Sequence, residues 1–238
     1  MYLKNNILFK IMEEEDKSLI NGYSLDSQFL IVDVETNGLP TKRNAHYSEI
    51  DVWPRIVQIS WGIYDIYGNE LKFNDHIINP RGTFSISEES SKIHGITNKI
   101  AREKGISIKK ALKEFRSDVT TNENLVAFIS HNINFDLNVI KSEFSRINRR
   151  LKLTNKEIIC TMLATTNFCK LDRCINPKPG SSYKYPKLEE LYYILFECPM
   201  EKAHDSKYDV INLAKCFFHL LNNYKKNGQM KLTQFERV

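Results

Sequence analysis

The sequence predicts an α/β fold built on a mixed five-stranded sheet, antiparallel over its first three strands and then parallel, with helices on its faces. Three extended, largely apolar segments come first, at 29–35, 55–64 and 71–79, and a short turn-rich connection joins the last two as a hairpin. Two more apolar segments, at 125–130 and 157–161, are preceded and separated by helical segments. Strands that alternate with helices favour parallel pairing, so these two should extend the sheet on its parallel side.

The helices are predicted from apolar spacing and from capping residues. Ser85 and Glu88 resemble a capping box at the start of the first helical region. Ile108, Leu112 and Phe115 then follow helical spacing. Further helices are expected over 135–146, 188–195 and 206–221.

A basic, turn-rich loop is expected at 167–187, between the last strand and the last two helices. Lys178, Lys184 and Lys187 lie in it. These lysines either meet phosphates or form an ordinary solvated charged surface.

Length and composition predict one compact domain. The chain has 238 residues, and we assign residues 28–223 to the domain, 1–27 to an N-terminal helical extension and 224–238 to a polar C-terminal tail. The net charge of +5 permits a polyanionic partner without requiring one. No apolar run approaches the ~20 residues that span a bilayer and no signal peptide is visible, so we expect a soluble, cytoplasmic protein. The five cysteines, an odd number, disfavour a disulfide framework in a chain of this length, and the absence of a Cys-x-x-Cys spacing disfavours a zinc site.

Two carboxylates, Asp33 and Glu35, interrupt the first predicted strand, whose other residues from 29 to 34 are apolar. Side chains alternate along a strand, so the two carboxylates point to the same face. Two negative charges held close together on a mostly buried strand repel each other and lose hydration, which is unfavourable unless a cation lies between them. Mg²⁺ and Mn²⁺ favour carboxylate oxygens, so the pair predicts a divalent metal site.

Other acidic residues fall at the ends of predicted elements. Asp136 lies where the fourth strand gives way to a helix, at the edge of an α/β sheet where ligands gather. Asp205 is a candidate N-cap of the last helix, which places His204 just outside that helix and Asp209 in its second turn. Asp209 borders the apolar stripe of the helix, so its carboxylate needs a partner. Taken singly, each of these residues is more often structural, for example as a helix-start carboxylate.

Together these residues form an ordered set, with Asp33-x-Glu35 on the first strand, Asp136 after the fourth, and His204-x4-Asp209 at the last helix. The set resembles the DEDDh 3′-to-5′ exonucleases, the DnaQ-like family of the RNase H-like superfamily, over roughly residues 28–221. The resemblance extends to three further segments, His94-Gly-Ile96, His131-Asn-x-x-Phe-Asp136 and Cys160-Thr161.

The last motif separates two branches of that family. A tyrosine variant has Tyr four residues before the last Asp, whereas this chain has Asp205 at that position. His204, five residues before Asp209, fits the histidine branch.

The resemblance implies a two-metal hydrolase. Two divalent cations, Mg²⁺ or Mn²⁺, would be held by Asp33, Glu35, Asp136 and Asp209, with Glu35 also reaching the 3′ region of the terminal nucleotide. His204 would take the proton from the attacking water, because an imidazole titrates near neutrality. Two metals ~4 Å apart can stabilise both the attacking and the leaving oxygen. The product would be a 5′-mononucleotide.

The same resemblance suggests substrate contacts. Thr36 and Leu39 are candidates for contacting the terminal nucleotide, with ordinary turn structure as the alternative. His94 would line the same pocket, and Phe135 either contacts the substrate or packs beneath Asp136 as core. Stacking and backbone contacts of this kind tolerate any sequence, so a single-stranded or frayed nucleic acid 3′ end is the expected partner.

Three functional hypotheses follow. The first is a 3′-to-5′ exonuclease on DNA, with a DNA polymerase or a repair complex as a partner and proofreading or DNA repair as its role. The second is an exoribonuclease that trims RNA ends. The third, from a different class, is a noncatalytic module that keeps the fold to bind a polymerase or nucleic acid, for which lost carboxylates would be the signature, and none is lost here.

Overall fold

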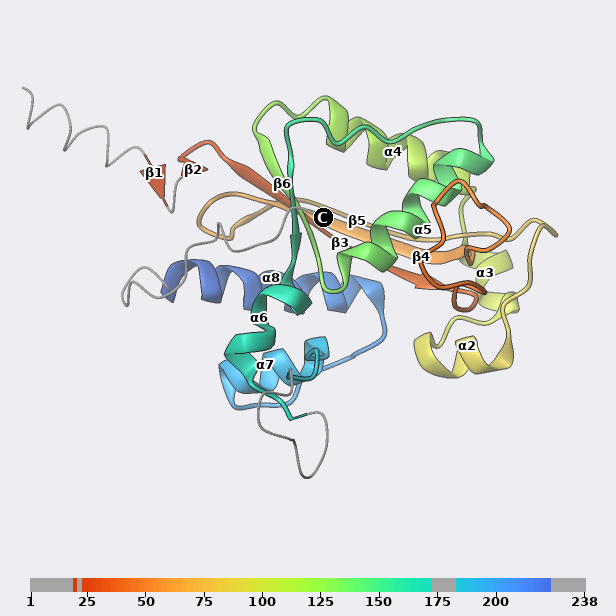
Figure 1. Cartoon of the computed structure of the whole chain (residues 1–238). Coiled ribbons are helices and arrows are strands. Elements are labelled where there is room, and N and C mark those ends of the chain that lie inside the picture. Colours follow the sequence, from red (N-terminus) through yellow and green to blue (C-terminus); the bar gives the residue numbers. More distant parts are fainter. Residues whose placement is uncertain (1–18, 21–22, 173–182, 224–238) are drawn as a thin grey trace, which may run out of the picture.

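The computed structural model describes residues 19–20, 23–172 and 183–223 of the chain. Five strands form its main sheet, namely β3 (Gln28–Thr36), β4 (Ile56–Tyr64), β5 (Glu70–Ile77), β6 (Leu125–Ser130) and β7 (Glu157–Cys160). Their spatial order is β5-β4-β3-β6-β7 (Figure 1). The first three strands pair antiparallel, whereas β6 pairs parallel with β3 and β7 pairs parallel with β6. The predicted mixed sheet is therefore confirmed.

The central strands are covered on both faces. All nine residues of β4 are buried, and residues 29–32 of β3 are fully enclosed. Such strands are mostly apolar because helices lie over both sides of them. β5 is an edge strand with mostly exposed or half-buried polar residues, which protects the open edge from pairing with another chain.

Two helical layers cover the sheet. Helices α4 (Ile108–Thr120) and α5 (Ile133–Arg146) pack on one face, where their apolar side chains join those of Leu30, Val32 and Phe128. Helix α8 (Ser206–Asn223) packs on the opposite face, against Phe29 and Ile31. Figure 1 shows α4 and α5 on one side of the sheet and α8 on the other. Because Asp33 and Glu35 continue the alternation of Phe29 and Ile31, they face the α8 side.

Two short helices follow β5. Helices α2 (Glu88–His94) and α3 (Asn98–Lys104) are capped by Ser87 and Thr97, whose side chains accept hydrogen bonds from backbone N–H groups in the first turn. The predicted capping box of Ser85 and Glu88 is wrong, because the helix begins at Glu88 itself and the carbonyl of Ser85 instead accepts a hydrogen bond from Asn37.

Helix α6 (Thr161–Cys169) directly follows β7, and helix α7 (Leu188–Phe196) precedes α8. The sequence did not predict α6, whose end also shortens the expected loop at 167–187. In that loop Lys184 pairs with Glu190, and Lys187 pairs with Glu189 at 3.1 Å. Lys178 lies outside the described residues, within the gap at 173–182.

The described part of the predicted N-terminal helical extension is not helical. Residues Leu19–Ile20 (β1) and Tyr23–Ser24 (β2) form a small antiparallel pair. Residues 1–18 and the predicted tail at 224–238 lie outside the described residues, so those assignments stay predictions. None of the helices in the described ranges combines the length and the apolarity that crossing a bilayer requires.

Candidate active site

A cleft of about 660 Å³ opens where the end of β3, the start of α5, the start of α7 and the start of α8 meet. The carboxyl ends of β3 and β6 lie at the same edge of the sheet because the two strands are parallel. The cleft is lined by the four predicted carboxylates of Asp33, Glu35, Asp136 and Asp209, by a fifth on Glu189, and by the imidazoles of His131 and His204. The metal ligands and the base predicted from the sequence therefore come together in one place.

Three of the carboxylates form a compact cluster. One carboxylate oxygen from each of Asp33, Glu35 and Asp209 lies within 4.8 Å of the other two. Asp33 and Glu35 come from one face of β3. Asp209 lies in the first turn of α8, rather than in the second turn that the sequence predicted, and its residue is only 8% exposed. Its Oδ2 accepts a hydrogen bond of 3.1 Å from the backbone N–H of His204.

Asp136 reaches the cluster from the start of α5. It is 3% exposed, and both of its oxygens accept hydrogen bonds, Oδ1 from the Val34 N–H at 3.2 Å and Oδ2 from the Ser130 hydroxyl at 2.6 Å. Asn132 turns the chain into α5 with a left-handed φ of 74°, a conformation that asparagine tolerates well. This turn and the two hydrogen bonds hold the carboxylate beside β3.

Burial and mutual repulsion raise the pKa values of all four carboxyl groups. Burial is the largest cause for each, and the neighbouring negative charges add to it. The pKa of Glu35 rises to about 8, and those of Asp136 and Asp209 rise to about 7. The pKa of Asp33 lies well above its usual range, because it is buried between the charges of the other three. Within the described residues, none of the four forms an ion pair with a basic side chain.

A divalent cation fits this arrangement. The Oδ1 atom of Asp209 is buried and has no hydrogen-bond partner among the described residues. Such an atom needs a partner, and hard divalent cations prefer carboxylate oxygens. Asp33, Glu35 and Asp209 offer oxygens close enough together to share an ion, and the charge of Asp136 lies near Asp33. The cluster therefore has the donor chemistry of a divalent-metal site.

His204 lies at the rim of the cleft. It has a left-handed φ of 66° and an exposed side chain, while its backbone N–H is bound to Asp209. The imidazole lines the same cleft as the carboxylates. A solvent-accessible imidazole beside a charged site is placed to exchange protons with water.

A polar network that the sequence did not reveal fixes the start of α8. Asp205 is the N-cap, as predicted, since its Oδ1 accepts the Lys207 N–H at 3.1 Å. The same oxygen accepts a hydrogen bond of 3.0 Å from Gln58 on β4, and Ser206 shares a hydrogen bond of 2.7 Å with Ser60, two residues along β4. These bonds tie the segment that carries His204 and Asp209 to the sheet. In the sequence, this network is indicated only by Gln58 and Ser60, two polar residues in an otherwise apolar strand.

His131 lies between β6 and α5, as its motif indicated, but the sequence did not predict its contacts. Its Nε2–H donates to the carbonyl of Pro186 at 2.8 Å, and its Nδ1 lies 3.0 Å from the Thr161 hydroxyl. Burial lowers the pKa of His131 to about 4, so the imidazole is neutral. It thus joins the end of β6, the start of α6 and the segment that leads into α7 along one wall of the cleft.

The four predicted substrate-binding residues fall into two groups. Leu39 and Phe135 line the cleft, and Leu39 is 79% exposed, as an apolar contact for a ligand would be. Thr36 and His94 do not line it. The Thr36 hydroxyl donates to the carbonyl of Gly38 at 2.7 Å, and His94 is buried next to the Thr36 backbone, with its Nδ1 accepting the Ile96 N–H at 3.1 Å. Contact of these four residues with a nucleotide stays a prediction.

A family model described as RNase_T, Exonuclease, matches residues 30–217. The matched range includes all four predicted metal ligands, which lie on strand β3 and on helices α5 and α8. No curated protein sequence matches the chain at a significant level.

Solved structures of exonuclease I share the fold. The zinc-bound E. coli exonuclease I–single-stranded DNA complex has 19% identity and a TM-score of 0.65, over 84% of this chain and 42% of that chain. The E. coli enzyme in complex with a dT13 oligonucleotide gives 19% identity and a TM-score of 0.64 over the same shares. This chain thus spans about two fifths of those proteins. At this identity the likeness establishes the fold, and together with the family model it shows that the chain belongs to the exonuclease family, as a DnaQ-like member with the RNase H-like fold.

Proposed function

We propose that this protein is a metal-dependent 3′-to-5′ exonuclease of the DEDDh type, acting on single-stranded or frayed DNA 3′ ends. The observation that carries the proposal is the convergence of Asp33, Glu35, Asp136 and Asp209, with His204 at the rim of the same cleft. The likeness to exonuclease I bound to oligonucleotides supports single-stranded DNA as the substrate. The catalytic unit would be residues 28–223.

The residues that line the cleft would have three different roles in hydrolysis. The four carboxylates would hold two divalent cations, Mg²⁺ or Mn²⁺, which when bound supply positive charge against the developing charge on the phosphate oxygens. His204 would accept the proton of the attacking water, and its exposed imidazole can pass that proton to solvent. Leu39 and Phe135 would contact the terminal nucleotide and position its phosphodiester over the acidic cluster.

The direction and the site can be tested with labelled oligonucleotides. With Mg²⁺ or Mn²⁺, a 3′-labelled single strand should release a labelled 5′-mononucleotide first, a 5′-labelled strand should shorten progressively, and a circular single strand should survive. Asp33→Asn and Asp136→Asn should lower the rate by about 100-fold or more, because each removes a carboxylate that would hold the cations whose charge stabilises the transition state. His204→Gln should lower it by about 10²-fold to 10⁴-fold.

Glu103→Gln, which changes an exposed carboxylate on α3, is the matched control and should leave the rate unchanged. Intact 3′-labelled strands under these conditions would refute the proposal. Cutting of the circular strand would identify an endonuclease instead.

Two alternative functions, an exoribonuclease and a noncatalytic binding module, predict different results in digestion and binding assays. Faster digestion of RNA than of a DNA oligonucleotide of matched sequence would identify an exoribonuclease. A noncatalytic module would show no digestion of either, whereas metal binding measured by calorimetry and abolished by Asp136→Ala argues against it. A DNA polymerase or a repair complex is the proposed partner, and its capture by the wild-type chain would assign the proofreading or repair role.

A further inference from the structure

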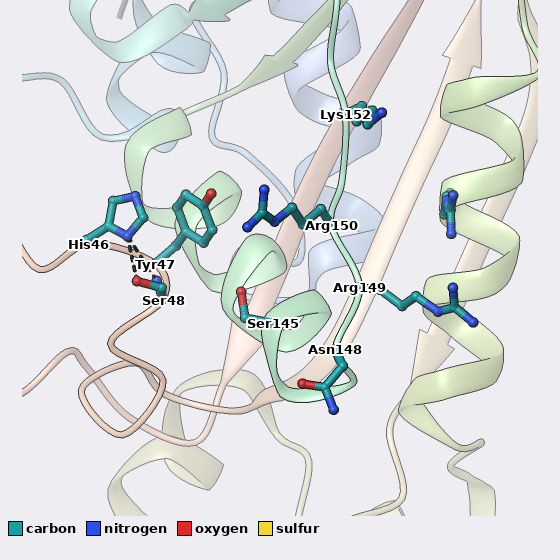
Figure 2. A pocket seen from close by; sticks show the side chains of 9 residues that line it. His46, Tyr47, Ser48, Ser145, Asn148, Arg149, Arg150 and Lys152 are labelled. Atoms are coloured by element: carbon teal, nitrogen blue, oxygen red, sulfur yellow. Dashed lines mark hydrogen bonds between the residues drawn. The ribbon is translucent and has the colours of Figure 1, made fainter.

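A second hollow lies at the opposite end of α5 from the acidic cleft and is strongly basic. It has a volume of about 700 Å³, and its walls include His46 and Tyr47 from the loop after β3, Arg116 from α4, and Arg149, Arg150 and Lys152 from the segment after α5 (Figure 2). Among the described residues, no acidic side chain lines it. We call this hollow, defined by those six residues, the basic pocket.

The segment after α5 is anchored, so its cations are held in place. The Arg149 N–H donates to the carbonyl of Phe144 at 2.9 Å, and Leu151 is buried in the core with Leu153 packed against it. Arg150 and Lys152 flank Leu151 and are therefore turned outward. In Figure 2 Arg150 extends toward Tyr47, whereas Arg149 extends in the opposite direction.

These cations have no anionic partner in the part of the chain that the structure describes. Among the described residues, Arg116, Arg149, Arg150 and Lys152 form no ion pair and no side-chain hydrogen bond. Arg146, one turn earlier, shows the contrast, because it pairs with the buried Glu143 at 3.4 Å. Four unneutralised charges repel each other, so an anion bound among them would be favoured.

The end of α5 does not account for this charge. A helix C-terminus is equivalent to roughly half a negative charge and would be balanced by a single cation. Its last carbonyls already accept backbone hydrogen bonds, since Phe144 and Ser145 receive the N–H groups of residues 147–149. The basic pocket therefore carries more positive charge than the helix end needs.

An aromatic surface lies beside the cations. The rings of His46 and Tyr47 are 4.1 Å apart, and the ammonium of Lys141 lies 5.4 Å from the centre of the Tyr47 ring. His46 is held by a 2.7 Å hydrogen bond between its Nδ1 and the Ser48 hydroxyl. Cations that track a phosphate backbone, next to rings on which bases stack, are the combination that binds single-stranded nucleic acid.

The basic pocket and the cleft are joined by two elements. Asp136 lies in the first turn of α5 and Ser145, which lines the basic pocket, lies in its last turn. Nine residues of helix place them about 14 Å apart along the axis. The loop after β3 also spans both sites, with Leu39 in the cleft and His46 in the basic pocket. A stacked strand rises about 3.4 Å per nucleotide, so about four nucleotides cover this distance.

We infer that the basic pocket binds the phosphates of a single-stranded substrate about four to five nucleotides from the 3′ end that occupies the cleft. This inference rests on the proposed exonuclease function, since it assigns the path of the same strand. It makes the enzyme's affinity depend on strand length, because a very short oligonucleotide fills the cleft without reaching the basic pocket.

The test compares Arg149→Gln/Arg150→Gln with the wild type on single-stranded oligonucleotides of three and twelve nucleotides. With Mg²⁺, kcat/KM for the 12-mer should fall about 10-fold or more, while that for the 3-mer should stay unchanged. In EDTA, binding of the 12-mer should weaken, and the slope of log Kd against log salt should fall by about 1.4, from two lost phosphate contacts. The control variant Arg102→Gln/Lys104→Gln removes the same amount of charge from α3, and its kcat/KM, Kd and salt slope should equal those of the wild type.

The inference would be overturned if the double variant kept the wild-type kcat/KM on the 12-mer, or if its kcat/KM fell equally on the 3-mer and the 12-mer. Tighter binding of duplex than of single strand at the basic pocket would overturn the single-strand assignment. If the wild type digests neither oligonucleotide, the proposed function fails, and the binding arm in EDTA still decides whether the basic pocket holds a strand.

Discussion

At the scale of single residues, the carboxylates in the cleft differ in how many hydrogen bonds they accept. Asp136 uses both oxygens, which fixes its orientation against β3 and β6. Asp209 uses only Oδ2, and its buried Oδ1 has no hydrogen-bond partner among the described residues. One acid is therefore positioned by the protein, whereas the other keeps a free oxygen for a ligand.

His131 should make stability fall in mildly acidic solution. Its folded pKa of about 4 lies below the ordinary value of 6.5, so the unfolded chain takes up a proton that the folded chain does not. The stabilisation is present above about pH 6.5 and is lost as the pH falls toward 4, by about 2–4 kcal/mol. Denaturant unfolding across this range should show the free energy of unfolding of the wild type falling relative to that of His131→Gln, because the acidic cluster contributes equally to both proteins. The same substitution at the exposed His46 is the control, and identical slopes for His131→Gln and wild type would contradict the prediction.

The sequence predicted those parts of the site that depend on short spacing. Asp33 and Glu35 share a face because strands alternate, and Asp205 caps α8 because the apolar stripe of that helix begins just after it. The contacts of Gln58 and Ser60 with the start of α8 join positions nearly 150 residues apart. Nothing local specifies such pairs, and the basic pocket was missed for the same reason.

At the scale of elements, the strands were predicted more closely than the helices. The strand at Leu125–Ser130 agrees residue for residue, because a buried strand is an uninterrupted apolar run. Helix α6 was missed because Thr161, Thr165 and Thr166 are weak helix formers, and their hydroxyls are instead bound within the site or to carbonyls one turn earlier. The cap of α2 was misplaced by two residues, since Ser85 and Ser87 are equally good candidates by type.

The ion pair between Arg55, the residue before β4, and Glu143 on α5 should make stability depend strongly on keeping both partners. Glu143 is fully buried and accepts hydrogen bonds from Arg55 at 2.7 Å and from the Ile56 N–H at 3.2 Å. Glu143→Leu should lower the free energy of unfolding by about 3–5 kcal/mol, because it leaves the partly buried guanidinium groups of Arg55 and Arg146 without their shared carboxylate. The double variant Arg55→Met/Glu143→Leu should lose less free energy of unfolding than Glu143→Leu alone, as measured by denaturant titration.

The exposed pair of Lys42 and Glu49 is the matched control. Glu49→Leu should lower the free energy of unfolding far less than Glu143→Leu does, because water already screens that pair. An equal loss for Glu143→Leu and Glu49→Leu would show that burial does not strengthen the dependence on the partner.

At the scale of the whole molecule, opposite charges are separated along α5. The acidic cleft lies at its start and the basic pocket at its end, although the net charge of the chain is only +5. A polyanion would be attracted to the basic end and repelled by the acidic end unless cations occupy the cleft. Under the proposed function, metal binding in the cleft would therefore strengthen substrate binding through charge.

The same charge should make stability depend on pH and on metal together. The folded pKa values of Glu35, Asp136 and Asp209, at about 8, 7 and 7, lie above their ordinary values, so the stability of the metal-free protein is lost as the pH rises through that range. In EDTA the Tm measured by calorimetry should be higher near pH 6 than near pH 8, with His131→Gln as the background that removes its opposing effect. Mg²⁺ binds ionised carboxylates, so it should raise the Tm more near pH 8 than near pH 6, and Asp209→Asn should reduce both effects. A Tm in EDTA that rises between these two pH values would show that the acidic cluster is not under the repulsion that its burial implies.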